Sequence, residues 1–245
     1  MNQRIASLLL VLTLVVSAGC ASSRNGDGVD PDTNAKRLYT DAERAMRSGN
    51  YTAAIGALEN LTAIYPFSEE ARQAQLNLIF VYWQNDQMDA ATTAADRFIL
   101  ENPTHPRVDY ALYMKGVARF PGDAGPLERL FRVDMDKRPP GEMQSAFNVF
   151  AQLIQQHPDS EYVADARQRM IYLRNRMAAH EIAVAKFYMA RSAHVAAINR
   201  ARNVLASFQG TPSVLPALEI MAEGYDALGL ADLAADTRQV IAANR

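Results

Sequence analysis

The stretch GNYTAAIGALENLTAIYP, residues 49–66, contains the pattern that decides the fold of this chain. Gly49 and Asn50 are typical of a tight turn, and Pro66 ends the segment because proline cannot continue a helix. Between them, apolar residues recur three or four positions apart and form one stripe of a helix, namely Ala54, Ile55, Leu58 and Leu61. The stretch therefore predicts a turn followed by one amphipathic helix.

The same pattern returns four times along the chain, in QMDAATTAADRFILENP (residues 87–103), EMQSAFNVFAQLIQQHP (142–158), AHVAAINRARNVLASFQ (193–209) and GLADLAADTRQVIAA (229–243). Each copy has a small residue where the second helix of a pair must approach the first closely; these residues are Ala54, Ala91, Ala146, Ala197 and Ala234. The first and last spacings between them, 37 residues, are near the tetratricopeptide period of about 34. The chain is therefore predicted to be all-α, a tetratricopeptide-repeat superhelix of about five helix pairs with a concave surface.

Two longer spacings require insertions between the copies. Residues 121–141 are rich in proline and glycine, which predicts a loop with at most a short helix near residues 127–132. Residues 161–191 instead predict one long helix that joins two parts of the superhelix rigidly. Its expected buried stripe consists of Val163, Ala166, Met170, Leu173, Met177, Val184 and Phe187.

The N-terminal residues predict export and lipid attachment. Residues 1–19 have a charged start, an apolar run and small residues at the end, which is typical of a secretory signal peptide. The small residues before Cys20, the only cysteine of the chain, resemble a bacterial lipobox, in which the cysteine is acylated. A conventional signal peptide with a cysteine nearby by chance is the alternative. Residues 20–34 are predicted to be the lipidated Cys20 and a flexible tether, and residues 35–245 the solenoid.

Composition and motifs predict a protein without catalytic residues, metal or cofactor. The formal net charge is −2, so no basic excess points to nucleic acid as a partner. The four histidines, at positions 105, 157, 180 and 194, lack ligand spacing, and Val184 stands where an HExxH zinc site needs its second histidine. A hidden enzyme site would have to lie in residues 121–141, where the required residue types are missing. The sequence therefore favours a protein that is not an enzyme.

Aromatic residues in the first helices of the second and third repeats are candidates for a binding surface. Phe80 and Trp83 lie three positions apart on a helix that must also bury leucine and isoleucine side chains, and these cannot all face one way. Core packing is the other interpretation of each aromatic residue. We expect some of them to line a groove beside Asn77, whose amide can pair with an extended peptide backbone. The predicted groove residues are Asn77, Phe80, Trp83, Tyr110 and Tyr113.

Three longer stretches carry a resemblance to a known family. They are YPFSEEARQAQLNLIFVYW (residues 65–83), DRFILENPTHPRVDYALYMKG (96–116) and VAKFYMARSAHVAAINRARNVL (184–205), together with RLFRVDMDKRPP (129–140) in the insertion. The chain resembles the BamD family, the tetratricopeptide lipoproteins of the outer-membrane β-barrel assembly machinery. The string NPTHP at residues 102–106, followed by Asp109 and Tyr110, is its most specific element.

The resemblance implies a lipid-anchored protein on the periplasmic face of the outer membrane that helps to fold and insert β-barrel proteins. Residues 35–158 resemble a groove for the C-terminal signal of unfolded barrel substrates. Residues 159–245 resemble a surface that docks on the last POTRA domain of the central barrel subunit. In the matching segment Arg200 would contact that subunit, with Asn199 beside it, and other assembly lipoproteins are implied partners. A solvated surface charge is the other interpretation of Arg200.

A different function remains open on the residues alone. A generic periplasmic tetratricopeptide-repeat lipoprotein, acting as a scaffold in envelope division or peptidoglycan work, would share the lipobox and the repeats. It would not need the particular groove residues.

Overall fold

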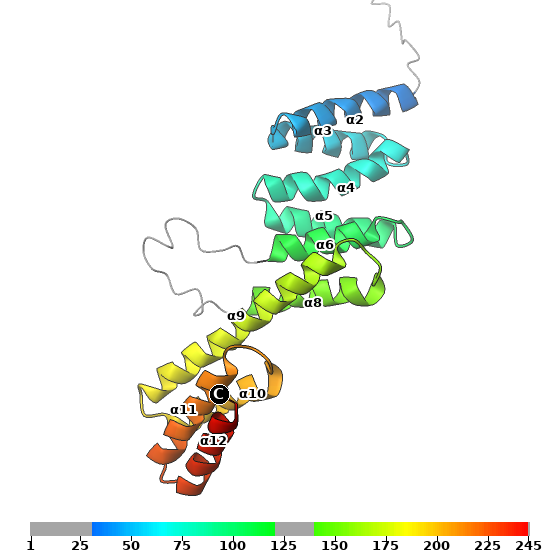
Figure 1. The fold of residues 1–245 in the computed structure, drawn as a ribbon. Coiled ribbons are helices and arrows are strands. Elements are labelled where there is room, and N and C mark those ends of the chain that lie inside the picture. The colour runs from blue at the N-terminus through cyan, green and yellow to red at the C-terminus, as the bar shows by residue number, and fades with distance from the viewer. Residues whose placement is uncertain (1–30, 121–139, 245) are drawn as a thin grey trace, which may run out of the picture.

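A computed structural model describes residues 31–120 and 140–244, in which ten α-helices follow one another without a strand. The helices are α2 (Pro31–Arg47), α3 (Tyr51–Ile64), α4 (Glu69–Gln84), α5 (Met88–Glu101), α6 (Val108–Arg119), α8 (Gly141–Gln156), α9 (Val163–Met189), α10 (His194–Ser207), α11 (Val214–Ala227) and α12 (Ala231–Ala243). They stack into an elongated array (Figure 1). The predicted all-α class is confirmed. The signal peptide, Cys20 and the short helix expected near residues 127–132 lie outside the described residues.

The helices form five pairs, α2–α3, α4–α5, α6–α8, α9–α10 and α11–α12, and each helix packs mainly on its neighbours in the chain. The small residues expected at the close approach are all fully buried in the second helix of their pairs; they are Ala54, Ala91, Ala146, Ala197 and Ala234. A side chain as small as a methyl group lets two helices come close and still fills the space between them. The repeat pattern therefore located the second helix of every pair.

The turn inside a helix pair repeats its backbone conformation. Gly49, Asp86, Ser192 and Gly229 have φ values of 73°, 59°, 57° and 73°, and each stands just before the N-cap of a second helix. In the first pair the amide of Asn50 bonds the carbonyl of Ala45 at 2.9 Å, which satisfies a carbonyl left free at the helix end. Only two of the four positions carry glycine, the residue that adopts positive φ without strain.

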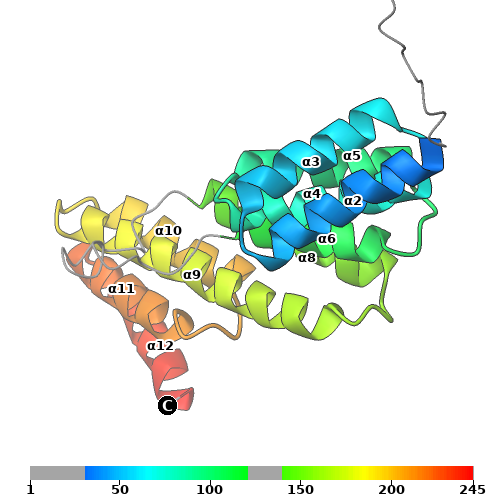
Figure 2. The same ribbon diagram turned by 90° about the horizontal axis from the view of Figure 1, so that it is seen from above.

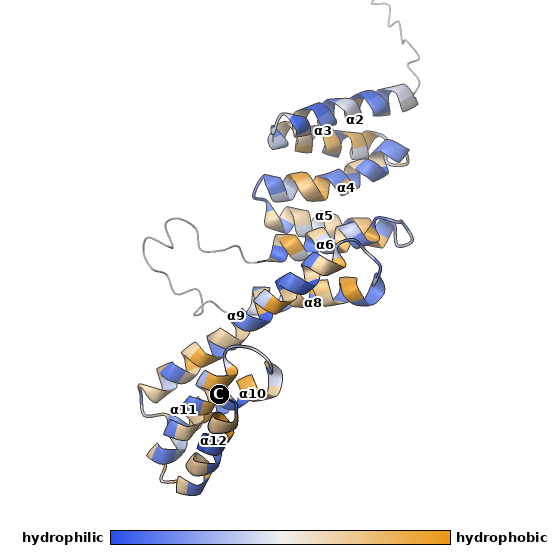
Figure 3. Ribbon diagram, viewed as in Figure 1, coloured by the Kyte–Doolittle hydropathy of each residue, from blue (hydrophilic) through white to orange (hydrophobic). Residues whose placement is uncertain are grey.

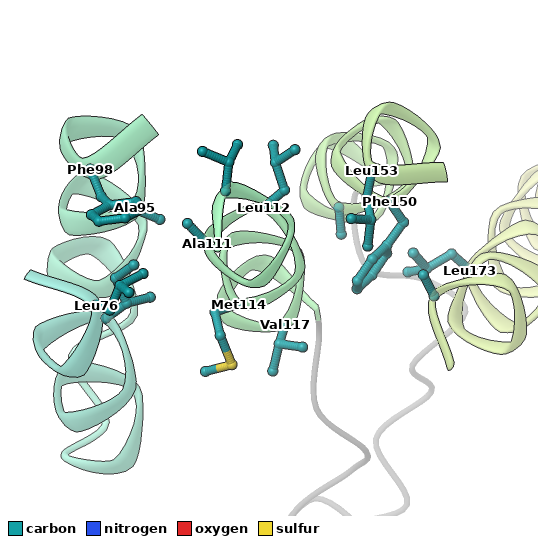
Figure 4. Packing of buried hydrophobic residues seen from close by; sticks show 14 of the residues in the cluster. Leu76, Ala95, Phe98, Ala111, Leu112, Met114, Val117, Phe150, Leu153 and Leu173 are labelled. Carbon is teal, nitrogen blue, oxygen red and sulfur yellow. The ribbon is translucent and has the colours of Figure 1, made fainter. Parts of the chain in front are cut away.

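The apolar core divides along the array. One cluster joins α2, α3 and α4, and a second extends from α4 to the first half of α9. Figure 4 shows that second cluster, to which the successive helices α5, α6, α8 and α9 contribute Phe98, Leu112, Phe150 and Leu173. A third cluster begins at Ala178 and joins the rest of α9 to α10, α11 and α12. Helix α9 therefore belongs to both parts, and the last helices extend to one side of the first stack (Figure 2).

The long helix is present, but its predicted buried stripe is wrong beyond Met177, and Met170 is only half-buried. Val184 is half-buried and Phe187 is 51% exposed, whereas Ala178, Ile182 and Ala185 are buried. The reason is that the first half of α9 packs in one apolar cluster with α8, whereas the second half packs in another with α10 and α11. A single stripe cannot serve neighbours on two sides.

The first described helix begins earlier than expected. Helix α2 starts at Pro31, so residues 31–34, predicted to end the flexible tether, are helical. Proline suits a first helical position because its fixed φ matches the helix and its missing N–H would have no partner there.

Polar residues recur along the labelled helices (Figure 3). Within residues 31–120 and 140–244, no helix combines the length and apolar character needed to cross a bilayer.

Candidate functional site

The first helices of the pairs share one face of the array, and Asn77 of α4 lies on it. The Asn77 side-chain nitrogen donates a hydrogen bond of 3.0 Å to the hydroxyl of Tyr39 in α2. Its oxygen accepts a hydrogen bond of 3.2 Å from Gln73. The side chain therefore points toward the neighbouring first helix. We call the surface formed by the half-buried side chains of α2, α4, α6 and the first half of α9 the A face.

Phe80 and Trp83 continue the A face along α4. Both are half-buried at the edge of the second apolar cluster. The Phe80 ring lies edge-on to Tyr51 with centroids 6.3 Å apart, and the Trp83 ring is 6.1 Å from Phe80. Each ring therefore has one side on the core and another toward the surface. Core packing and exposure on a binding surface are thus compatible for both residues.

Tyr110 and Tyr113 of α6 form a second aromatic group with Tyr162, the residue before α9. Tyr113 stacks on Tyr162 with centroids 4.6 Å apart and an interplanar angle of 19°, and Tyr110 lies 5.8 Å from Tyr162. Burial, with a smaller contribution from Tyr162, raises the pKa of Tyr110 to about 12. The three phenols are therefore neutral hydrogen-bonding groups on a largely apolar surface.

Charged side chains border this second group. The Arg107 guanidinium lies 5.0 Å above the Tyr110 ring and donates a hydrogen bond of 3.0 Å to the Tyr162 hydroxyl. Arg169 forms an ion pair with Asp165 and lies 5.0 Å from the centroid of Phe120. Burial alone would raise the pKa of Asp165, but hydrogen bonds from Arg169 and Tyr113 outweigh it and lower that pKa. Asp165 is therefore a carboxylate at neutral pH.

The five predicted groove residues are all half-buried, but the structure does not bring them into one contact group. Asn77 contacts α2, whereas Tyr110 and Tyr113 contact α9. Sequence reasoning missed the partners Tyr39, Tyr162, Asp165 and Arg169. Tyr39 lies one repeat before the Asn77 region, so the repeat period could have found it. No sequence signal could have found the other three, because their approach to α6 requires α8 and α9 to fold back on it.

One hollow in the N-terminal pairs lies between other helix faces. It measures about 570 Å³ and lies between α3, α4 and α5, where Glu59, Tyr82 and Arg97 are among its lining residues. None of the predicted groove residues lines it. The hollow is therefore distinct from the predicted groove residues.

Arg200 and Asn199 lie on α10, in the part of the array that contains the third apolar cluster. Both are exposed. The Arg200 guanidinium pairs with Glu181 of α9 at 3.3 Å; its side chain is 46% exposed and that of Glu181 only 12%. Arg200 is therefore oriented by an internal carboxylate while part of its donor fork still faces solvent.

The described residues assemble no metal centre. In residues 31–120 and 140–244, no three side chains among histidine, cysteine, aspartate and glutamate are grouped to hold an ion. His105 instead packs edge-on against Phe98, with ring centroids 5.2 Å apart, and its Nδ1 accepts a hydrogen bond from the Arg107 amide at 3.1 Å. These contacts stabilise the turn before α6.

Comparison with known proteins places the chain in a family. Residues 31–241 match the family model YfiO, described as outer membrane lipoprotein. The outer membrane protein assembly factor BamD of Vibrio cholerae serotype O1 is 38% identical over 244 residues, covering 100% of this chain and 99% of the relative. That of Neisseria meningitidis serogroup A is 38% identical over 240 residues, covering 97% and 90%.

Among solved structures, MamA aligns with a TM-score of 0.41 at 17% identity, covering 84% of this chain and 88% of MamA. The family match and the full-length relatives agree with each other and with the repeated helix pairs. The chain therefore belongs to the BamD family of outer membrane lipoproteins.

Proposed function

We propose that this protein is a non-catalytic assembly factor, anchored to the periplasmic face of the outer membrane through acylated Cys20, that supports the folding and insertion of β-barrel proteins. Family membership supports this, because the relatives are named outer membrane protein assembly factors. Several acyl chains on one cysteine anchor a protein firmly, since each buried methylene contributes about 0.8 kcal/mol. The protein then acts by holding two kinds of partner.

The A face binds the C-terminal segment of an unfolded barrel substrate. The observation that supports this proposal most is that the Asn77 amide still has unused hydrogen-bonding groups. An amide side chain offers two donors and two acceptor lone pairs. Tyr39 and Gln73 use one donor and one lone pair, so one of each remains for a peptide backbone. Phe80, Trp83, Tyr110 and Tyr113 provide apolar surface for alternate side chains of an extended segment.

The C-terminal pairs dock on the last POTRA domain of the central barrel subunit. Arg200 is the proposed anchor, with Asn199 next to it. Because Glu181 already orients the guanidinium, a partner carboxylate can bind the exposed edge without ordering a free side chain. Other assembly lipoproteins are further partners of the same complex.

Peptide binding tests the first proposal. A fluorescent peptide with the C-terminal sequence of an outer-membrane β-barrel protein is titrated with the wild-type chain, Asn77→Ala and Trp83→Ala. Both variants should bind more weakly. Trp83→Ala, which removes an aromatic contact, should weaken binding by roughly tenfold. Tyr39→Phe is the matched control for Asn77→Ala, because it removes the same bond between α2 and α4 but keeps the amide. Equal weakening in Tyr39→Phe and Asn77→Ala would mean that only packing was lost.

Docking is tested with the isolated last POTRA domain. Arg200→Glu should weaken its binding strongly, since reversal of a charge that contacts a carboxylate costs about 2–5 kcal/mol when the pair is buried. Glu181→Gln is the control, because it removes the internal partner but keeps the cation. If Arg200→Glu bound the domain normally, or lost peptide and POTRA binding equally, the two-surface proposal would be wrong.

A further inference from the structure

A groove on the C-terminal pairs is not used by either proposed interaction. It measures about 610 Å³ and lies between the second half of α9 and the start of α11. Alanines 179, 183 and 190 and the buried Ile182 contribute its α9 side, and Pro212 and Pro216 contribute the opposite wall. This volume falls within the range of about 300–1,000 Å³ in which proteins bind ligands.

Phe187 gives the groove an exposed aromatic side. Phe187 is 51% exposed although it belongs to a helix with many buried residues. The Arg191 guanidinium lies 3.5 Å from the ring centroid and also donates to the Phe187 carbonyl at 3.3 Å. The ring is therefore held in place by a cation, and a large apolar side chain of another molecule could cover what remains exposed.

The charges around the groove have one sign. Lys186 and Arg191 are both exposed, and neither forms an ion pair with a carboxylate in the described part of the chain. None of the residues lining the groove is acidic. This contrasts with the overall formal charge of −2. A carboxylate-bearing ligand would find two cations that have no carboxylate partner among the described residues, beside apolar surface, which is the arrangement expected for an acidic partner.

The groove is separate from Arg200. The partner of Arg200, Glu181, lies two positions from Ala179 and from Ala183, both of which line the groove. Positions two apart on an α-helix point about 200° apart around its axis, so Glu181 is on the opposite side of α9. A partner bound at Arg200 therefore leaves the groove accessible.

We propose that this groove, between Phe187 and Pro216, is a second docking site that binds an extended segment of another protein chain, with carboxylates on both sides of one large apolar side chain. The apolar residue packs on Phe187 and the alanines of α9. The carboxylates pair with Lys186 and Arg191. The C-terminal pairs can thus hold two partners at once, on opposite sides of the same helix.

Fluorescence anisotropy with a designed peptide tests the site on the full-length protein in detergent. The probe is a short fluorescein-labelled peptide with aspartate and glutamate residues on both sides of a central leucine. It should bind the wild type, bind less at high salt, and bind at least about tenfold more weakly to Lys186→Glu/Arg191→Glu. Phe187→Ala should also weaken it. The milder Lys186→Gln/Arg191→Gln variant serves if the reversed charges impair folding, which thermal unfolding would reveal.

Controls on the same helix distinguish the groove from general attraction. Ile171→Ala removes another large exposed apolar side chain, 56% exposed, and Arg167→Glu reverses another exposed charge; both should bind as the wild type does. Arg200→Glu should also bind normally, whether or not it still docks the POTRA domain. The proposal is wrong if the wild type does not bind the probe, if a peptide with glutamine and asparagine in place of the acids binds equally, or if control and groove variants lose affinity alike.

Discussion

The hydroxyl of Tyr113 in α6 donates a hydrogen bond of 2.8 Å to Asp165 in α9. Arg169 pairs with the same carboxylate one helical turn further on. Because Tyr113 also stacks on Tyr162, aromatic and charged contacts fasten α9 to the third helix pair at one place. Helix α9 begins the C-terminal part of the array, so these contacts help set the direction in which that part leaves the first stack.

Acidification should remove the contribution of Asp165 to stability. Its pKa is lowered in the folded state relative to about 3.9 in an unfolded chain. The stabilisation is therefore fully present above the unfolded pKa and is lost as the pH falls through the folded one. We expect Asp165→Asn to lower the free energy of unfolding by about 0.2–1 kcal/mol at pH 7, the range for partly exposed ion pairs. Thermal unfolding of both proteins should show that difference shrinking below about pH 4; a difference that grows would contradict the assignment.

Gly116 should not tolerate a methyl group. A Cβ at this position would lie 2.5 Å from the Phe150 ring, so α6 and α8 would have to move apart. We expect Gly116→Ala to destabilise the protein by about 1–3 kcal/mol in chemical denaturation. Gly56→Ala is the control, since nothing lies within 4 Å of its Cβ and alanine favours the helix by up to about 1 kcal/mol. Similar effects at the two glycines would show that the α6–α8 approach is not close.

The alanines of the second helices should be sensitive to enlargement. Ala54 and Ala91 are fully buried, so Ala54→Leu and Ala91→Leu should each cost about 1–3 kcal/mol in the free energy of unfolding. Ala53→Leu provides the control, because Ala53 is exposed on the same helix. The measurement is urea unfolding followed by circular dichroism. Equal stability of Ala53→Leu and Ala54→Leu would place the repeat pattern on the wrong face.

The positive φ of Gly49 predicts a purely conformational cost. Gly49→Ala should lower the free energy of unfolding by about 1–2 kcal/mol, although a Cβ there would touch nothing within 4 Å. Gly49→Asn should cost less, because asparagine adopts positive φ more readily. Both are measured by thermal unfolding. An alanine variant as stable as the wild type would mean that the turn can change its conformation.

Cys20→Ser should release the protein from the membrane without unfolding it. The cysteine precedes the first described helix by residues 21–30, so no packed helix of the described part depends on the lipid. Membrane fractionation should find the variant in the soluble periplasmic fraction, with the circular dichroism of the wild type. Its partners must be absent in this experiment, since docking alone could retain it; recovery in the membrane fraction without them would argue against lipid anchoring.

The sequence alone determined the repeated helix pairs and much of their register. The pattern of turn residues, apolar stripe and buried alanine is local, because a helix presents residues three and four apart on one face whatever lies around it. This is why the five alanines, the second helices and the long helix α9 could be predicted. The same locality placed Asn77, Phe80 and Trp83 together along α4.

Only the tertiary structure decided which of these helix faces meet. The rotation of the buried face of α9 after Met177 depends on where α10 and α11 pack, and the partners Tyr162 and Asp165 reach Tyr113 only after α8 and α9 fold back on α6. Likewise, the groove at Phe187 exists because that residue, expected in the core, faces the start of α11 across an open space. Contacts between residues far apart in the chain depend on the geometry of intervening helices, which a period of three or four residues does not encode.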